Sequence, residues 1–226
     1  MRLILVRHGD PDYENDCITP LGNLQAKAAS ERLKDEGISG ICSSSCGRAL
    51  ETAQYTADLL GLRIEKFDFL REISWGSEDG TEILKNGHPW HVSDQMVEDN
   101  ASLFEGYENY FANNRISRYI EKSAEDIDNW LSGFGYKREG HFYRNTGAAT
   151  DKTIAVFGHG GIFTLLLSRL FNIPYPFVFQ AIRMDMTSVT VISFSDEPGK
   201  LVSPRFEILA DARHIKDIKE ENVYGF

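Results

Sequence analysis

Two histidines and two arginines lie where predicted strands give way to helices. Arg7 and His8 directly follow one short apolar strand, and His159 directly follows another, within the run FGHGG. Arg48 lies at the start of a predicted helix, after a Ser-rich loop. In an open α/β sheet the carboxyl ends of parallel strands meet at one edge, where ligands bind. We therefore expect these four side chains to meet at that edge.

These residue types match the demands of phosphoryl transfer. A phosphoryl group in transfer spreads negative charge over its equatorial oxygens, which two guanidinium groups can bind in bidentate fashion. A neutral imidazole can attack phosphorus and form a phosphohistidine. A second imidazole can stabilise the charge that develops, and a carboxylic acid must protonate the leaving oxygen. The four side chains therefore predict a phosphoryl-transfer enzyme.

Strands alternate with helices at both ends of the chain. The hydrophobic pattern predicts strands at 2–6, 38–42, 63–67, 152–158, 187–195 and, at a sheet edge, 205–212, and helices at 20–36, 47–61 and 161–171. This alternation predicts a three-layer α/β/α sandwich with a mainly parallel central sheet. We expect residues 1–226 to form a single domain with a helical insertion at about 76–150 that caps the site, its best helix lying within 102–131.

The composition is that of a soluble globular protein. Of 226 residues, 42% are hydrophobic, and no apolar run is long enough to span a bilayer. The formal net charge of −10 argues against partners such as nucleic acid or an anionic membrane, but a locally cationic pocket can still bind a small phosphorylated substrate. The N-terminal apolar stretch is too short for a signal peptide, and the three cysteines lack metal-site spacing. We expect a cytoplasmic location, and the sequence leaves the oligomeric state open.

Four short motifs resemble those of a known family. In chain order they are LVRHG (5–9), SSxxxRAxxTA (43–53), LREIxxG (70–76) and GHGG (158–161). Their order and intervals resemble the histidine phosphatase superfamily, which includes phosphoglycerate mutases and many small-molecule phosphatases. The resemblance covers roughly residues 1–80 and 150–195. It implies a phosphomonoesterase that needs no metal and no other cofactor.

The resemblance also implies a role for each matching residue. His8 corresponds to the phosphorylated nucleophile, and Arg7 and Arg48 correspond to phosphate ligands. His159 corresponds to the second histidine of the phosphate pocket. Glu72 falls where the family places its proton donor.

Three other functions remain open from the sequence. A phosphoglycerate mutase-type phosphotransferase would also use His8, but residues 10–16 lack the Trp-Asn pair expected of cofactor-dependent mutases, which favours hydrolysis. A catalytically inactive module could bind a phosphate ligand with the same residues. Cys42 and Arg48 have the CX5R spacing of cysteine-dependent phosphatases. That hypothesis leaves His8 and His159 without a role, and burial as a small hydrophobe is the simpler account of Cys42.

Simpler explanations exist for several of these residues. Arg48 could be an ordinary helix-face residue, and Glu72 precedes an acidic stretch typical of a solvated loop. His88 and His91 have no convincing partners for metal binding, so we expect them to be cavity-wall or surface residues. The aromatic and cationic residues at 107–122 are expected to belong to a packed amphipathic helix rather than to the pocket.

Overall fold

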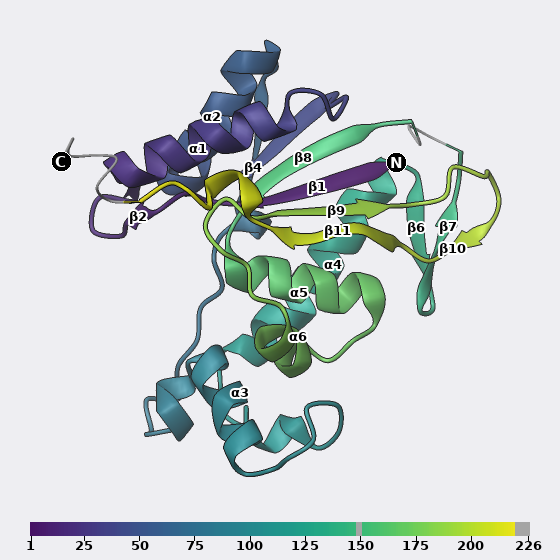
Figure 1. The fold of residues 1–226 in the computed structure, drawn as a ribbon. Helices are drawn as coiled ribbons and strands as arrows, with labels where there is room; N and C mark the ends of the chain where they lie inside the picture. The colour runs from purple at the N-terminus through teal and green to yellow at the C-terminus, as the bar shows by residue number, and fades with distance from the viewer. Residues whose placement is uncertain (148–150, 220–226) are drawn as a thin grey trace.

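A six-stranded sheet forms the centre of the molecule (Figure 1). The structure is a computed structural model that describes residues 1–147 and 151–219. Within these residues the strands of this sheet are, in spatial order, β11 (Arg205–Asp211), β9 (Val189–Ser193), β1 (Arg2–Arg7), β8 (Thr153–Gly158), β4 (Gly40–Ser44) and β5 (Ile64–Phe67). Strands β1, β8, β4 and β5 run parallel, whereas β9 is antiparallel to both of its neighbours. The predicted α/β class with a mainly parallel sheet is confirmed, and β11 lies at the predicted edge.

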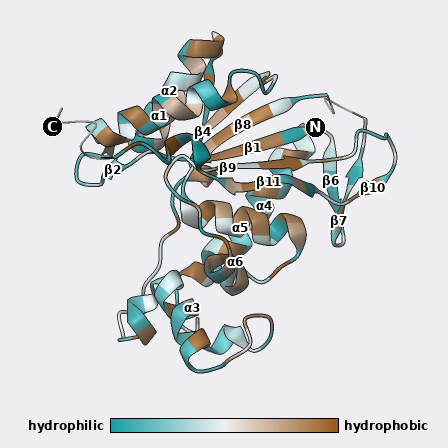
Figure 2. Cartoon of the chain, in the orientation of Figure 1, coloured by the Kyte–Doolittle hydropathy of each residue, from teal (hydrophilic) through white to brown (hydrophobic). Residues whose placement is uncertain are grey.

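Helices cover both faces of this sheet. On one side lie α1 (Pro20–Leu33) and α2 (Gly47–Leu60), and on the other lie α4 (Ile116–Gly133) and α5 (Gly160–Phe171) (Figure 1). Helix α6 (Tyr175–Ala181) packs against α5, and α3 (Pro89–Glu98) packs against α6, farther from the sheet. Successive side chains of a strand point to opposite faces. Accordingly, Ile4 and Val6 pack into the core that includes residues of α1 and α2, whereas Leu3 and Leu5 join the core that includes α5. Figure 2 shows the apolar residues concentrated in the central strands and in α5.

Two smaller sheets flank the central one. They are β10 (Leu201–Val202), β7 (Phe142–Asn145) and β6 (Tyr136–Glu139), and the pair β2 (Pro11–Asp12) and β3 (Cys17–Ile18). Strands β6 and β7 belong to the predicted insertion, whereas β10 follows β9 near the end of the chain. The fully buried rings of Tyr136 and Tyr143 contact Phe194, which directly follows β9. Strand pairing and aromatic packing therefore join the insertion to the central sheet.

The main differences from the expected elements lie in the insertion and in the segment that follows α5. The helix expected within 102–131 is present as α4, but the sequence pattern does not predict the β6–β7 hairpin or α6. The hairpin strands carry several charged residues, and α6 has a proline in its first turn, so neither has the hydrophobic pattern of a buried element. Residues 148–150, at the expected end of the insertion, lie outside the described residues. Among the helices of the described chain, none combines the length and apolar character needed to cross a bilayer.

Candidate active site

The carboxyl ends of β1 and β8 bring the two predicted histidines together. Arg7 is the last residue of β1, and the backbone N–H of the following His8 donates to Gly158 O at the end of β8, 2.9 Å away. His159 directly follows β8 and is the N-cap residue of α5. The centroids of the His8 and His159 rings lie 5.1 Å apart. The two motifs, distant in sequence, thus form one site as the sequence predicts.

Arg48 reaches the same region from the first turn of α2. It is buried, and its Nη1 lies 2.5 Å from Oδ1 of Asp16. Asp16 also accepts a hydrogen bond from the backbone N–H of Gly47, 2.8 Å away. The Arg48 guanidinium carbon lies 5.4 Å from the ring centroid of Tyr13, whose ring is 6.5 Å from that of His8. The sequence pattern does not single out Asp16 or Tyr13, because the stretch that contains them departs from the family motif.

His8 is held in a single tautomer. Its Nδ1 lies 2.7 Å from the backbone carbonyl oxygen of Gly9, which can only accept, so Nδ1 carries the hydrogen and Nε2 keeps its lone pair. Burial lowers the pKa of His8 to about 4, and the charges of Arg7 and Arg48 act in the same direction, whereas the Gly9 hydrogen bond opposes them. His8 is therefore neutral at neutral pH, with a nucleophilic Nε2.

His159 and the arginines leave polar atoms that a ligand can satisfy. His159 Nε2 lies 2.9 Å from Ser44 Oγ at the end of β4, and burial, with the nearby His8 and arginines, lowers the pKa of His159 to about 2. Within the described part of the chain, His159 Nδ1, Arg7 Nε and Arg48 Nε are buried without a hydrogen-bond partner. Buried polar groups are costly to leave unpaired. An anion with several acceptor oxygens would pair with the two guanidinium groups.

Glu72 caps the helix that begins at His159. Its carboxylate accepts hydrogen bonds from the backbone N–H groups of Gly161 at 3.3 Å, Ile162 at 3.1 Å and Ile73 at 2.9 Å. A Cβ atom on Gly161 would lie 2.5 Å from Glu72 Oε1, so this approach requires glycine. Burial raises the pKa of Glu72, although these N–H groups and Arg7 oppose the shift. Glu72 therefore holds a proton at higher pH than an exposed glutamate does.

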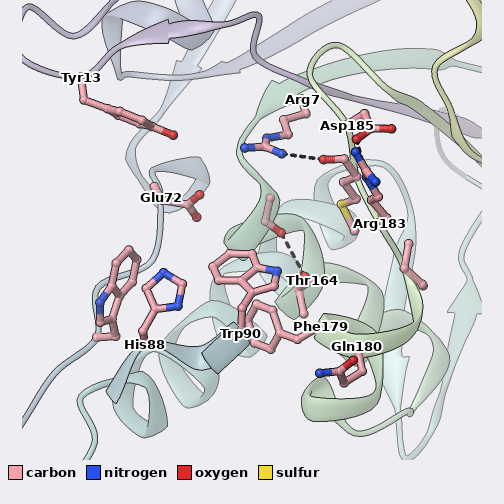
Figure 3. Close-up of a pocket in the computed structure, with 14 residues that line it drawn as sticks. Arg7, Tyr13, Glu72, His88, Trp90, Thr164, Phe179, Gln180, Arg183 and Asp185 are labelled. Atoms are coloured by element: carbon pink, nitrogen blue, oxygen red, sulfur yellow. Dashed lines mark hydrogen bonds and ion pairs between the residues drawn. The ribbon is translucent and has the colours of Figure 1, made fainter. Parts of the chain in front are cut away.

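A cavity of about 580 Å³ opens beside these groups (Figure 3). Arg7 and Glu72 contribute to its lining, and Thr164 of α5 lies between them and α6. Much of the remaining wall is aromatic, formed by Trp75, His88, Trp90 and Phe179. His88 is thus a cavity-wall residue, and its ring stacks on that of His91 with centroids 4.1 Å apart.

The segment at 107–122 lies elsewhere. Within the described chain, none of these residues lines the cavity beside Arg7. Tyr107 instead packs against Tyr175, with centroids 5.2 Å apart, and Arg118 pairs with Glu78 at 2.7 Å. The interpretation of this segment as packed and solvated structure agrees with these contacts.

Cys42 lies inside the sheet rather than in a loop. It is the third residue of β4, paired with Val156 of β8 and Glu65 of β5, and only 3% of it is exposed. Burial raises the pKa of the Cys42 thiol to about 12. The thiol is protonated at neutral pH and is a poor nucleophile. The cysteine-dependent alternative is therefore not supported.

Acidification is expected to lower the free energy of unfolding through the two buried histidines. Their pKa values in the folded chain, about 4 for His8 and about 2 for His159, lie below the ordinary value of 6.5. From pH 6.5 down to about 4 the unfolded chain takes up protons that the folded chain does not, so stability falls as pH falls. Between pH 7 and pH 5 the free energy of unfolding is expected to fall by about 2 kcal/mol per histidine. Urea unfolding at both pH values measures it.

Two variants separate this effect from the titration of other groups. In His8→Asn the fall in the free energy of unfolding over the same pH interval should be about 2 kcal/mol smaller than in the wild type. His141→Gln, at an exposed position, should behave as the wild type does. An equal loss in the wild type and in His8→Asn would show that His8 is charged in the folded state at pH 5.

Known proteins share this sequence pattern and this fold. The model of the histidine phosphatase superfamily (branch 1) matches residues 3–130. A Hydrogenobacter thermophilus protein named as a candidate phosphoserine phosphatase is 26% identical over 215 residues, which cover 89% of this chain and 93% of that protein. Solved structures of phosphatases also have a similar fold, among them the following two.

The first of these structures is a phosphoserine phosphatase mutant from Entamoeba histolytica in complex with phosphoserine, with a TM-score of 0.63 and 20% identity over 95% of this chain and 98% of that one. The second is a mycobacterial glucosyl-3-phosphoglycerate phosphatase, with a TM-score of 0.62 and 22% identity over 92% of this chain and 98% of that one. At these identities the structures establish the shared fold. Because the family model spans more than half of the sequence, this chain belongs to the histidine phosphatase superfamily, branch 1.

Proposed function

We propose that this protein hydrolyses small phosphate monoesters through a phosphohistidine on His8. The observation that carries the proposal is the state of His8: neutral, with Nδ1–H bound to the Gly9 carbonyl and the Nε2 lone pair available. Its ring lies in an edge arrangement against that of His159, and the charges of Arg7 and Arg48 act on both histidines. This combination supplies a nucleophile and a binding site for a phosphate dianion.

In the first step His8 Nε2 attacks the phosphorus atom. A P–N bond forms while the P–O bond to the leaving group breaks. The guanidinium groups of Arg7 and Arg48 bind the equatorial oxygens, whose charge increases in the transition state. Glu72, whose pKa burial raises, donates its proton to the leaving oxygen so that an alcohol departs rather than an alkoxide.

In the second step water attacks the phosphorus atom and the P–N bond breaks. The Glu72 carboxylate accepts a proton from the water, so inorganic phosphate is released and both His8 and Glu72 return to their starting states. The N–H groups of Gly161 and Ile162 hold this carboxylate between the two steps. Glu72 then needs no movement to change from acid to base.

The stretch at about 76–150 is proposed to cap the site and set specificity. His88 and Trp90, both from this stretch, line the cavity beside Arg7, which supports the proposal. We also propose that the enzyme needs no metal and works in a reducing compartment such as the cytoplasm. Cys17, Cys42 and Cys46 are free thiols, as such a compartment allows.

A phosphoenzyme trap tests this function against the mutase alternative. We expect radiolabelled 4-nitrophenyl phosphate to give an acid-labile, base-stable adduct on the peptide that contains His8, and then free phosphate without any bisphosphorylated primer. Turnover that requires such a primer and moves the label to a sugar acid would identify a mutase. Vanadate binding without adduct or phosphate release would identify an inactive binding module.

A further inference from the structure

The aromatic wall of the cavity begins next to the phosphate-binding end. Gly160, in the first turn of α5, lies between Trp90 and Arg7: a Cβ atom built on it would be 3.6 Å from Trp90 Cζ2 and 3.8 Å from Arg7 Nε. The Trp90 indole is therefore close to a guanidinium group that binds phosphate. Figure 3 shows Trp90 between His88 and Phe179, with Arg7 and Glu72 across the cavity. On the aromatic side of the cavity, the indole ring of Trp90 is therefore the nearest wall group to the alcohol part of a phosphate ester bound at Arg7.

The wall continues outward as a connected row of rings. Ring centroids are 4.6 Å apart between Trp90 and Phe179, 5.5 Å between Trp90 and His88, and 4.8 Å between His88 and Trp75. Contacts at these distances fix the orientation of each ring. Burial and the neighbouring His91 lower the pKa of His88, so this member of the row is also uncharged at neutral pH. The row is thus a connected and uncharged aromatic surface.

Each charged residue that lines the cavity has at least one partner within the protein. Arg183 Nε and Asp185 Oδ1 lie 2.7 Å apart, and Glu72 accepts backbone hydrogen bonds at the start of α5. Arg7 Nη1 donates to the Met184 carbonyl oxygen, 2.6 Å away. An amino-acid leaving group would bring an ammonium and a carboxylate, each needing an opposite charge. Beyond Arg7 and Glu72, the described residues of the lining offer such charges only in the exposed Arg183–Asp185 pair.

From this geometry we propose that the substrates are phosphate monoesters of flat aromatic alcohols. The ring lies one or two bonds from the ester oxygen and stacks on Trp90 while Arg7 binds the phosphate. A cavity of about 580 Å³ has room for the phosphate and a ring system together. The inference rests on the proposed phosphatase function of the same site, and it differs from the amino-acid ester named for relatives of this chain.

Benzyl phosphate and cyclohexylmethyl phosphate form the matched test pair. Both esters release primary alcohols of similar acidity and similar size, so they differ mainly in the planarity and π-system of the ring. We expect kcat/KM to be about three- to tenfold higher for benzyl phosphate, the size of a specific aromatic contact. Phosphoserine, also an ester of a primary alcohol, should be the poorest of the three substrates.

Substitutions in the aromatic wall test whether it causes the preference for benzyl phosphate. Trp90→Leu should bring the benzyl to cyclohexylmethyl ratio close to one, whereas Trp90→Phe should keep part of it. Phe104→Leu is the matched control, because Phe104 is an exposed aromatic residue that stacks on Phe177 outside the cavity lining. Its ratio should equal that of the wild type. The dissociation constants of benzylphosphonate and cyclohexylmethylphosphonate provide the same comparison for the wild-type protein without any substitution.

The outcomes separate this inference from the function on which it rests. Phosphate release from both esters at equal kcat/KM, or a better kcat/KM for phosphoserine than for benzyl phosphate, overturns the aromatic inference and leaves the phosphatase intact. A ratio that survives in Trp90→Leu also overturns it. Failure to form a phosphoenzyme or to release phosphate from any of the three esters overturns the phosphatase, and the aromatic inference with it.

Discussion

His8→Ala is expected to lower kcat on 4-nitrophenyl phosphate by about 10⁵-fold, close to abolition, because no other described group can form the covalent intermediate in this site. The neighbouring His159, whose Nε2 is bound to Ser44 Oγ, is proposed to bind the phosphate rather than to attack it. Initial rates are measured with a metal chelator in excess, and the wild-type rate should be unaffected by the chelator. The His8→Ala protein should form no labelled adduct.

Cys42→Ser is the control for this experiment. Cys42 is buried within β4 and its thiol has a raised pKa, so the substitution should leave kcat within about twofold of the wild type once folding is verified by circular dichroism. Loss of activity in Cys42→Ser together with activity in His8→Ala would place the nucleophile on the sulfur and overturn the mechanism. Inhibition of the wild type by the chelator would contradict the metal-independent proposal.

Glu72→Gln is expected to have its largest effect on substrates with poor leaving groups. For an alkyl phosphate, whose oxygen must be protonated as it departs, kcat should fall by about 10²- to 10⁴-fold. For 4-nitrophenyl phosphate, whose leaving group is stable as an anion, the fall should be much smaller. A plot of log kcat/KM against leaving-group pKa therefore becomes steeper in the variant. Equal losses across the series would remove Glu72 from the role of proton donor.

The helix-capping role of Glu72 requires its own control. Because the Glu72 carboxylate accepts N–H groups of α5, Glu72→Gln also changes stability, which urea unfolding measures separately. Loss of stability alone would lower all rates together and would not change the slope of the plot. Glu78→Gln, which removes a nearby carboxylate paired with Arg118, should leave that slope as it is in the wild type.

The sequence predicts which side chains meet at this edge of the sheet because the relevant signals are local. Each short apolar strand is followed directly by a polar residue, and parallel pairing of β1 with β8 then brings His8 and His159 together. Glycines in the sequence likewise mark where the helices near Arg48 and His159 begin. These positions can be predicted from the hydrophobic period of the strands and from the order of strands and helices, and a single sequence contains both.

The features that the sequence does not predict depend on contacts between distant segments. Asp16 reaches Arg48 only through the fold of the loop after β1, and no spacing rule relates the two. Trp90 becomes a cavity residue because α3 packs against α6, which the hydrophobic pattern does not reveal. The β6–β7 hairpin is stabilised by β10 and by burial of Tyr136 and Tyr143, so its short strands have little signal of their own.

The pairing of β7 with β10 limits how this protein can exchange parts with its relatives. Leu201 and Val202 pair with Arg144 and Tyr143, so two segments separated along the chain share one sheet. A chimera whose replacement for 76–150 lacked equivalents of β7, Tyr136 and Tyr143 would leave β10 without its partner strand and expose the apolar surface of Phe194. We expect an exchange limited to the segment from Trp75 to the start of α4 to leave this pairing intact. That segment supplies three of the four wall rings, so substrate preference can diverge there while the fold stays intact.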